Sequence, residues 1–298
     1  MQLHRLGLIL LPSLLLACDP PLTPGNFSAQ VLDAQTGDSV QNFQEVSQTT
    51  EDLSGTWVLV SDWSTCVTVG DKFELRNYEI SRVQIVQEGL ALHETREDCS
   101  VVNTPLLAQT TVVPPPAVQS ANPMKSTAFM PSTLPGMPYT GGVEVQTWGL
   151  KFGDPLTESM PVDETDSRIV DSDNDGHPGV TLKVGGICEL YAIQRAVMVR
   201  TGAMDKNGIL SGGGTRNIVQ VALGASSGFC ATQFTTVSNQ TDNHWKMRRV
   251  DKQGLNLDAN GDGKVTCDEI VQNQAAFLQP PTDDWTPPDD KHCENVGP

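Results

Sequence analysis

Apolar and polar positions alternate along much of the chain between residues 53 and 250. Val83 and Ile85, for example, alternate with Arg82 and Gln84, which is the pattern of a β-strand with one buried face. Turn residues separate such runs, and no strand–helix–strand alternation is present, which excludes a doubly wound parallel sheet. The pattern predicts a mainly β domain over residues 53–250, built as an antiparallel barrel or as a sandwich.

Two segments depart from this alternation. Residues 105–138 contain eight prolines and few charged residues, which is typical of a long loop or a partly disordered lid. From Ile270 to Leu278 apolar residues recur at helical spacing, and Pro280 would end a helix there. We therefore expect a Pro-rich loop inside the β domain and a short helix in a C-terminal module spanning residues 251–298.

The N-terminus has the features of an export signal rather than of a folded element. Residues 1–17 combine a short basic start with an apolar run that is too short to span a bilayer comfortably. The sequence LLAC that ends at Cys18 resembles the lipobox of bacterial lipoproteins. That resemblance implies cleavage before Cys18 and a lipid on its thiol, whereas the alternative is a secreted protein cleaved near Ala17. Residues 18–52 are polar without an apolar period, so we expect a flexible tether.

The chain is acidic, with 19 Lys+Arg against 36 Asp+Glu and a formal net charge of −17. A surface of this kind repels nucleic acid and anionic headgroups and attracts divalent cations. The 26 glycines and 20 prolines fit a fold with many turns. Composition therefore argues against a nucleic-acid partner and favours a cation-binding role.

Six cysteines remain once the lipobox cysteine is set aside, and an even number in an exported chain predicts disulfides. Their order along the chain favours three local pairs, namely Cys66–Cys99, Cys188–Cys230 and Cys267–Cys293. The chain has no C-x-x-C motif, which argues against a zinc ribbon or a thioredoxin-like site.

The stretch LDANGDGKVTCDEI, residues 257–270, contains a complete calcium-loop pattern, D-x-[DN]-x-[DN]-G-x₅-E. Alternate oxygens in such a loop turn toward one centre, the glycine makes the sharp turn, and the final glutamate closes the site with two oxygens. The expected ligands are the side chains of Asp258, Asn260, Asp262 and Glu269 and the backbone carbonyl of Lys264. The stretch resembles an EF-hand or dockerin-type loop. The segment before it lacks helical periodicity, so we expect a loop with one flanking helix, suited to a structural role.

A second acidic loop, DSDNDGHPGVT at residues 171–181, repeats the first half of this pattern. It resembles the D-x-D-x-D-G loops of thrombospondin type 3 repeats. Its twelfth position is Leu182, which cannot ligate calcium, so an upstream carboxylate would have to complete the site. The expected ligands in the loop are Asp171, Asp173 and Asp175, and the upstream candidates are Asp163, Glu164 and Asp166.

Two further resemblances concern the fold and the family. Gly55-Thr56-Trp57 resembles the G-x-W opening of lipocalin-like barrels. Residues 171–181, followed by CELYAIQR at 188–195 and QVALGAS at 220–226, resemble a family of predicted bacterial envelope lipoproteins whose biochemical role is undefined. The second resemblance implies export and a β architecture, and it supplies no activity.

One stretch matches a catalytic motif. GASSG, residues 224–228, fits G-x-S-x-G with Ser226 as the nucleophile. That motif requires a strand before the serine and a helix after it, and the residues that follow do not have a helical pattern. We therefore predict no catalytic residue.

Together these features predict a calcium-binding lipoprotein of the bacterial cell envelope, held at the inner or outer membrane by its N-terminal lipid, with Ca²⁺ in a structural role and no enzymatic activity. Two alternatives stay open. One is a small-ligand-binding β-barrel lipoprotein, and the other is a serine hydrolase that acts through Ser226. The sequence identifies neither a protein partner nor a small ligand.

Overall fold

The computed structural model describes residues 51–69, 71–104, 111–121, 123–228, 230, 235–240, 243–251, 255–277 and 293. The chain divides into two units, Met1–Gln48 and Thr49–Pro298, and every described residue belongs to the second unit. The predicted signal segment and Cys18 therefore lie outside the described residues, as does the predicted tether except for its last two residues. No helix in the described part of the chain is long and apolar enough to cross a membrane.

The described chain is mainly β, as predicted, with twelve strands in one antiparallel sheet. The strands are β1 Gly55–Val69, β2 Asp71–Glu88, β3 Ala91–Asn103, β4 Thr111–Val112, β5 Met124–Phe129, β6 Pro138–Thr140, β7 Glu144–Trp148, β8 Val180–Val184, β9 Cys188–Met204, β10 Leu210–Ala225, β11 Thr235–Ser238 and β12 His244–Arg249. The helices are α1 Pro115–Gln119, α2 Cys267–Gln272 and the 3₁₀ helix η1 Gln274–Ala276.

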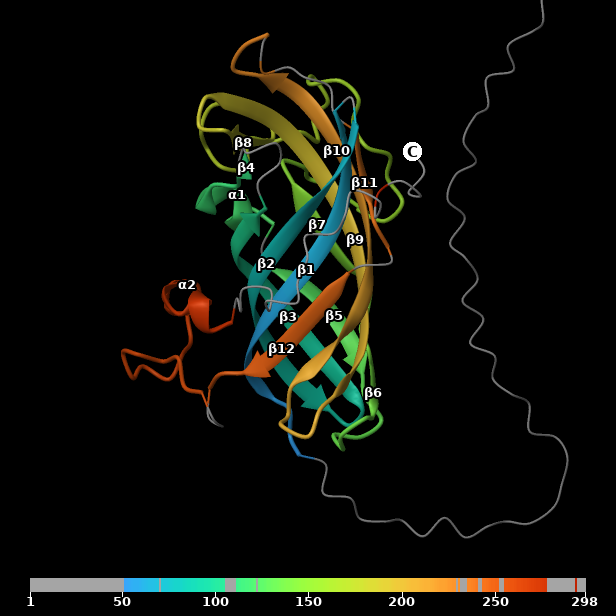
Figure 1. The fold of residues 1–298 in the computed structure, drawn as a ribbon, viewed down its shortest axis with the longest axis vertical. Coiled ribbons are helices and arrows are strands. Elements are labelled where there is room, and N and C mark those ends of the chain that lie inside the picture. Colours follow the sequence, from blue (N-terminus) through green and yellow to red (C-terminus); the bar gives the residue numbers. More distant parts are fainter. Residues whose placement is uncertain are drawn as a thin grey trace, which may run out of the picture. The chain divides into compact units, whose positions relative to one another are not determined.

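The sheet closes into a ring, which is the barrel rather than the sandwich of the two predicted architectures. Pairing runs from β10 through β12, β1, β2 and β3, and then through β5 and β6 to β9, which pairs with β10 again. A second path joins β3 to β9 through β4 and β8. Figure 1 shows the long strands β1, β2, β9 and β10 wrapped around a common interior.

Inside the ring, a polar layer separates the two larger apolar clusters, and a small third cluster consists of Trp63, Met124 and Met198. Along β9, Leu190 and Ala192 belong to one apolar cluster and Met204 to the other, with the buried Arg200 between them. The cluster that contains Leu190 and Ala192 also includes Ala117 and Val118 of α1. A buried layer of this kind is costly, because each buried charge needs partners to offset its loss of water.

The C-terminal residues lie against the outer face of the ring. Val58 of β1 and Ile80 of β2 point outward, yet both are buried, because Leu257, Val265 and Ile270 cover them. Figure 1 shows α2 outside the sheet, beside β2 and β3. The predicted C-terminal module is therefore packed on the wall of the barrel.

The Pro-rich segment 105–138 is not the continuous loop that we predicted. Its described residues include strands β4 and β5 and helix α1. Proline at the first positions of α1 is compatible with a helix, because those residues would have no hydrogen-bond partner for an N–H group. The clustered prolines therefore begin a helix.

The predicted C-terminal helix is present but differs in length. It begins at Cys267, where Thr266 caps it, and ends at Gln272, before the apolar spacing ends. Asn273 has φ −104° and ψ 10°, outside the helical region, and a 3₁₀ turn follows. The later apolar residues of the pattern therefore do not extend α2.

All six predicted cysteines form disulfides, but two of the three predicted pairings were wrong. Cys188–Cys230 is confirmed. Cys66 pairs instead with Cys293, and Cys99 pairs with Cys267. Chain order misled the prediction, because the C-terminal segment returns to the barrel wall, so that cysteines 227 and 168 residues apart meet.

Candidate metal sites on the barrel

The first half of the C-terminal loop folds around the carboxylate of Asp258. Oδ1 accepts hydrogen bonds from the backbone N–H groups of Gly261 (2.7 Å) and Asp262 (3.1 Å), and Oδ2 accepts one from Gly263 (2.8 Å). Gly261 and Gly263 have φ of 75° and 83°, in the region that favours glycine. The predicted sharp turn at Gly263 is therefore present, with Asp258 holding it.

The next two predicted ligands also fold back over the loop. Oδ1 of Asn260 accepts from the N–H of Asp262 at 2.9 Å, and Oδ1 of Asp262 accepts from the N–H of Lys264 at 2.8 Å. The Asn260 amide donates to Oδ2 of Asp262 at 3.3 Å. These contacts hold positions 1, 3 and 5 of the loop on the same curled segment.

Glu269 connects the two ends of the loop. Its Oε1 accepts from the N–H of Ala259 at 2.9 Å, and its Oε2 accepts from the N–H and the hydroxyl of Thr266, each at 2.9 Å. Thr266 in turn caps α2, so the two residues form a capping box. The hydrogen bond from the Thr266 N–H holds the pKa of Glu269 below its usual value. An ionised carboxylate therefore lies beside the start of the loop, as the calcium-loop pattern requires.

The barrel wall supports this loop from outside. Val265 is 2 % exposed and packs against Val58 and Ile80, and its carbonyl accepts a hydrogen bond from Arg82 Nη1 at 3.3 Å. The disulfide from Cys267 to Cys99 fixes the start of α2 to β3. No helix precedes the loop in the described part of residues 243–258, as predicted. The wall thus provides the support that a preceding helix gives an EF-hand loop.

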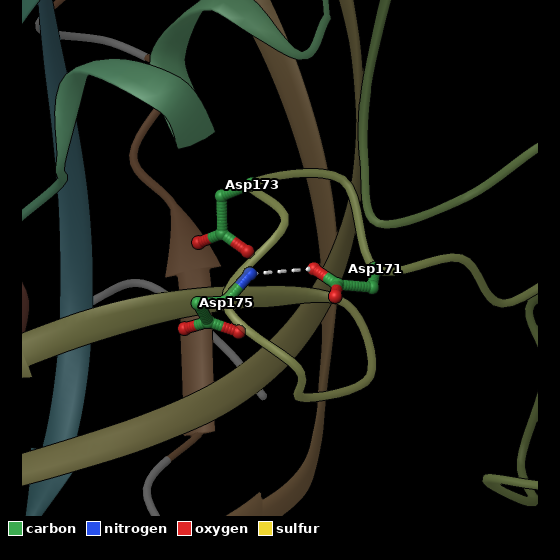
Figure 2. A group of neighbouring side chains, drawn as sticks. All are labelled: Asp171, Asp173 and Asp175. Atoms are coloured by element: carbon green, nitrogen blue, oxygen red, sulfur yellow. Dashed lines mark hydrogen bonds between the residues drawn. The ribbon is translucent and has the colours of Figure 1, made fainter.

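In the second loop three carboxylates converge (Figure 2). Asp171, Asp173 and Asp175 each offer an oxygen, and these oxygens lie within 4.8 Å of one another. Among the described residues this is the single group of three or more acidic, His or Cys side chains gathered in this way. Three like charges so close together repel one another, and a divalent cation between them would offset that repulsion.

The backbone of the same loop brings the carboxylates together. Asp171 accepts from the N–H groups of Asp175 (3.2 Å) and Gly176 (2.9 Å), and Asp173 Oδ2 accepts from the N–H of Thr181 (2.8 Å). Burial raises the pKa of Asp173. Its Oδ1 is buried and has no hydrogen-bond partner among the described residues. Asn174, within the turn that carries the three aspartates, has φ 58°, in the left-handed region.

The upstream carboxylates do not complete this group in the structure. Asp166 forms an ion pair with Arg168 at 2.7 Å, and the hydrogen bond from Arg168 lowers the pKa of Asp166 to about 2. Asp163 accepts hydrogen bonds from the N–H and hydroxyl of Thr165. The loop therefore offers three aspartates, whereas the C-terminal loop offers the full pattern.

Ser226 lies just beyond the end of β10, where the chain bends. Its hydroxyl accepts from the N–H of Glu189 at 3.1 Å, and the sulfur of Cys230 is 3.8 Å away. Residues 226–228 form no helix, so the strand–serine–helix arrangement of a nucleophile elbow is not formed there. These contacts are those of a hydroxyl that ties two neighbouring strand ends together.

Sequence reasoning missed the buried charge layer inside the barrel. Arg96 donates from Nε to Asp98 (3.0 Å), from Nη1 to Glu144 (2.8 Å) and from Nη2 to Glu79 (3.1 Å). Burial alone would lower the pKa of Arg96, but the three carboxylates raise it above its ordinary value. A signal was present in ETRED, residues 94–98, which is polar on both faces of a predicted strand.

A second arginine extends this layer. Arg200 donates from Nη2 to Glu94 (2.9 Å) and also to Glu144, and its guanidinium lies 5.6 Å from the ring of Trp245. Tyr139 donates to Glu94 at 2.7 Å. Strands far apart in the sequence are therefore joined through the interior by charge-assisted hydrogen bonds.

Comparison with protein-family models, with curated proteins and with solved structures finds no match for this chain.

Proposed function

We propose that this protein is an exported calcium-binding lipoprotein of the bacterial cell envelope, in which calcium braces the C-terminal module against the barrel. The observation that carries the proposal is the 258–269 loop. Glu269, at the end of the loop, accepts a hydrogen bond from Ala259 at its start, the glycines take the required turns, and Val265 anchors the loop to the barrel wall. Its side-chain oxygens and the Lys264 carbonyl are the hard oxygen donors that calcium prefers.

The role of the metal would be structural. The module packs as a fixed piece on β1 and β2 and is joined to β3 by a disulfide, so the loop has little freedom to open. An exported site with a Kd of about 10⁻⁴ M at ~2 mM calcium would add about 2 kcal/mol to the free energy of unfolding, if calcium binds only the folded state.

The test compares two neighbouring carboxylates. Glu269 is the expected ligand at position 12, and Asp268 is exposed and outside the pattern. In calorimetric titrations of the purified, chelator-stripped protein, Glu269→Gln should abolish one calcium-binding event, while Asp268→Asn should keep it. Equal calcium binding by Glu269→Gln and wild type would refute the proposed site.

The 171–175 loop would hold a second calcium ion. Asp173→Asn should remove a binding event that Glu269→Gln leaves in place, because the two loops are separate. Asp205→Asn is the matched control, since Asp205 accepts two backbone hydrogen bonds in the β9–β10 turn without neighbouring carboxylates. A wild-type stoichiometry of one, unchanged in Asp173→Asn, would restrict calcium to the C-terminal loop.

The lipid anchor is supported by the sequence LLAC that ends at Cys18, and three disulfides fit an oxidising compartment. Metabolic labelling with an alkyne fatty acid should mark the wild-type protein and not Cys18→Ser. Labelling of neither protein would argue for a secreted protein instead, and labelling of both would exclude Cys18 as the site of the lipid.

A further inference from the structure

Arg216 of β10 is the third arginine of the buried charge layer. Arg216 is 3 % exposed, and its guanidinium lies 5.7 Å from the ring of Trp63. Nη2 donates to Oε1 of Glu79 at 2.8 Å. The side chain is therefore enclosed in the barrel, with an aromatic ring on one side and a single carboxylate at one nitrogen.

That carboxylate is shared. Oε2 of Glu79 also accepts from Arg96 Nη2 (3.1 Å) and from Trp63 Nε1 (3.0 Å). Among the described residues, Arg96 has three carboxylate partners and Arg200 has two, whereas Arg216 has one, which it shares with Arg96. Burial and the nearby charge of Arg96 lower the pKa of Arg216, although the carboxylates of Glu79 and Asp98 oppose this. Among the described residues, Arg216 thus has the fewest direct carboxylate partners of the three arginines.

Two nitrogens of this guanidinium lack protein partners. Nε and Nη1 are both buried, and no described residue accepts a hydrogen bond from either of them. The hydroxyl of Ser61, which lies opposite Glu79 in the β1–β2 register, is likewise buried and has no hydrogen-bond partner in the described part of the chain. Buried donors of this kind are costly, and those on a charged group are the most costly.

We propose that Arg216 binds a small monovalent anion, of the size of chloride, bromide or formate, inside the barrel through Nε and Nη1. A water molecule could accept hydrogen bonds from these nitrogens, but a small anion would accept charge-assisted hydrogen bonds, which are stronger, from the arginine with the fewest direct carboxylate partners. Because Trp63 and Glu79 beside the guanidinium are both fully buried, the proposal is restricted to small ions. Gluconate is too large and serves as the reference anion.

The experiment measures thermal unfolding of the full chain at constant sodium concentration and ionic strength, with gluconate replaced stepwise by chloride or bromide. The wild-type Tm should rise saturably by about 3 °C, which is the shift expected for an ion bound at roughly ten times its Kd. Arg216→Met should abolish the dependence. Arg168→Met, which removes a partly exposed arginine paired with Asp166 outside the barrel, should keep it.

The outcomes separate an anion from a water. A wild-type Tm that is the same in gluconate and chloride, or a dependence that persists in Arg216→Met, would overturn the proposal. If Arg216→Met does not fold, crystals of the wild type grown in bromide decide the matter. An anomalous peak beside the Arg216 guanidinium supports the site, and water density there without a peak refutes it.

Discussion

Arg82 Nη1 of β2 donates a hydrogen bond to the carbonyl of Val265, 183 residues further along the chain. The same guanidinium pairs with Glu97 of β3 at 2.7 Å. The eighth position of the calcium-type loop is thus held by a charged side chain of the barrel wall as well as by apolar contacts. The loop and the barrel therefore form one energetic unit, and substitutions in the wall should change calcium binding at the loop.

Replacing Arg82 should weaken calcium binding although Arg82 is no ligand. Arg82→Met keeps the apolar stem and removes the hydrogen bond, so we expect a loss of about 1 kcal/mol in the free energy of unfolding and a weaker calcium affinity. Glu97→Gln is the control, because it removes the surface ion pair and leaves the bond to Val265. Urea unfolding and calcium titration of both variants check this. Equal effects of the two substitutions would mean that the Arg82–Glu97 ion pair, rather than the hydrogen bond to Val265, supports the loop.

The disulfide Cys99–Cys267 should matter for calcium, whereas Cys188–Cys230 should not. Cys267 begins α2 at the tenth position of the loop, so the double variant Cys99→Ser/Cys267→Ser would free that end from the wall. We expect a weaker calcium affinity and faster hydrogen exchange in residues 255–277. The double variant Cys188→Ser/Cys230→Ser is the control, because it also removes a disulfide but not the one at the loop. Unchanged affinity in both variants would show that packing alone positions the loop.

The features of the C-terminal loop that could be predicted are local ones. Spacing alone located Asp258, Gly263 and Glu269, because the turn and the capping box are made by residues within twelve positions of one another. Its supports could not be predicted in this way. Arg82 and Cys99 are brought to the loop by the closed sheet, and chain order contains no information about that approach.

The barrel interior shows the same limit. The alternation of apolar and polar residues indicates which strands have a buried face, but it is equally compatible with a sandwich and with a closed barrel. Pattern analysis also assigns charged residues to the solvent side, so Glu94, Arg96 and Asp98 are placed outside by the usual rule. They point inward because carboxylates and arginines from distant strands, such as Glu144 and Arg200, meet them there.

Removing one arginine of the layer should be far more damaging than removing a surface arginine. Arg96→Met removes the cation that Glu79, Asp98 and Glu144 have in common, and we expect a loss of about 3–5 kcal/mol in the free energy of unfolding. The control Arg168→Met removes a partly exposed pair and should cost less than about 1 kcal/mol. Equilibrium unfolding in urea measures both. Similar values for the two variants would mean that water enters the layer and takes over the pairing.

Two carboxylates that share Arg200 should respond to pH in opposite directions. Burial raises the pKa of Glu94 above 4.5, and Glu144 adds to this, although Arg200 opposes it. Burial also acts to raise the pKa of Glu144, but Arg200 and Arg96 together lower it below 4.5. The stabilising contribution of Glu94 is therefore complete below pH 4.5 and is lost as the pH rises through its folded pKa. That of Glu144 is present above pH 4.5 and is lost as the pH falls through its folded pKa.

The glutamine variants separate these two contributions, because glutamine keeps the size and cannot titrate. Relative to wild type, Glu94→Gln should gain stability as the pH rises from 4.5 to 7.5, since the wild type then loses the proton that the buried group favours. Glu144→Gln should be most costly at pH 7.5 and less so at pH 4, where the wild-type carboxyl approaches its neutral form. Urea unfolding at these three pH values gives both trends. If the two variants show the same trend, one common charge effect, rather than two opposed pKa shifts, governs the interior.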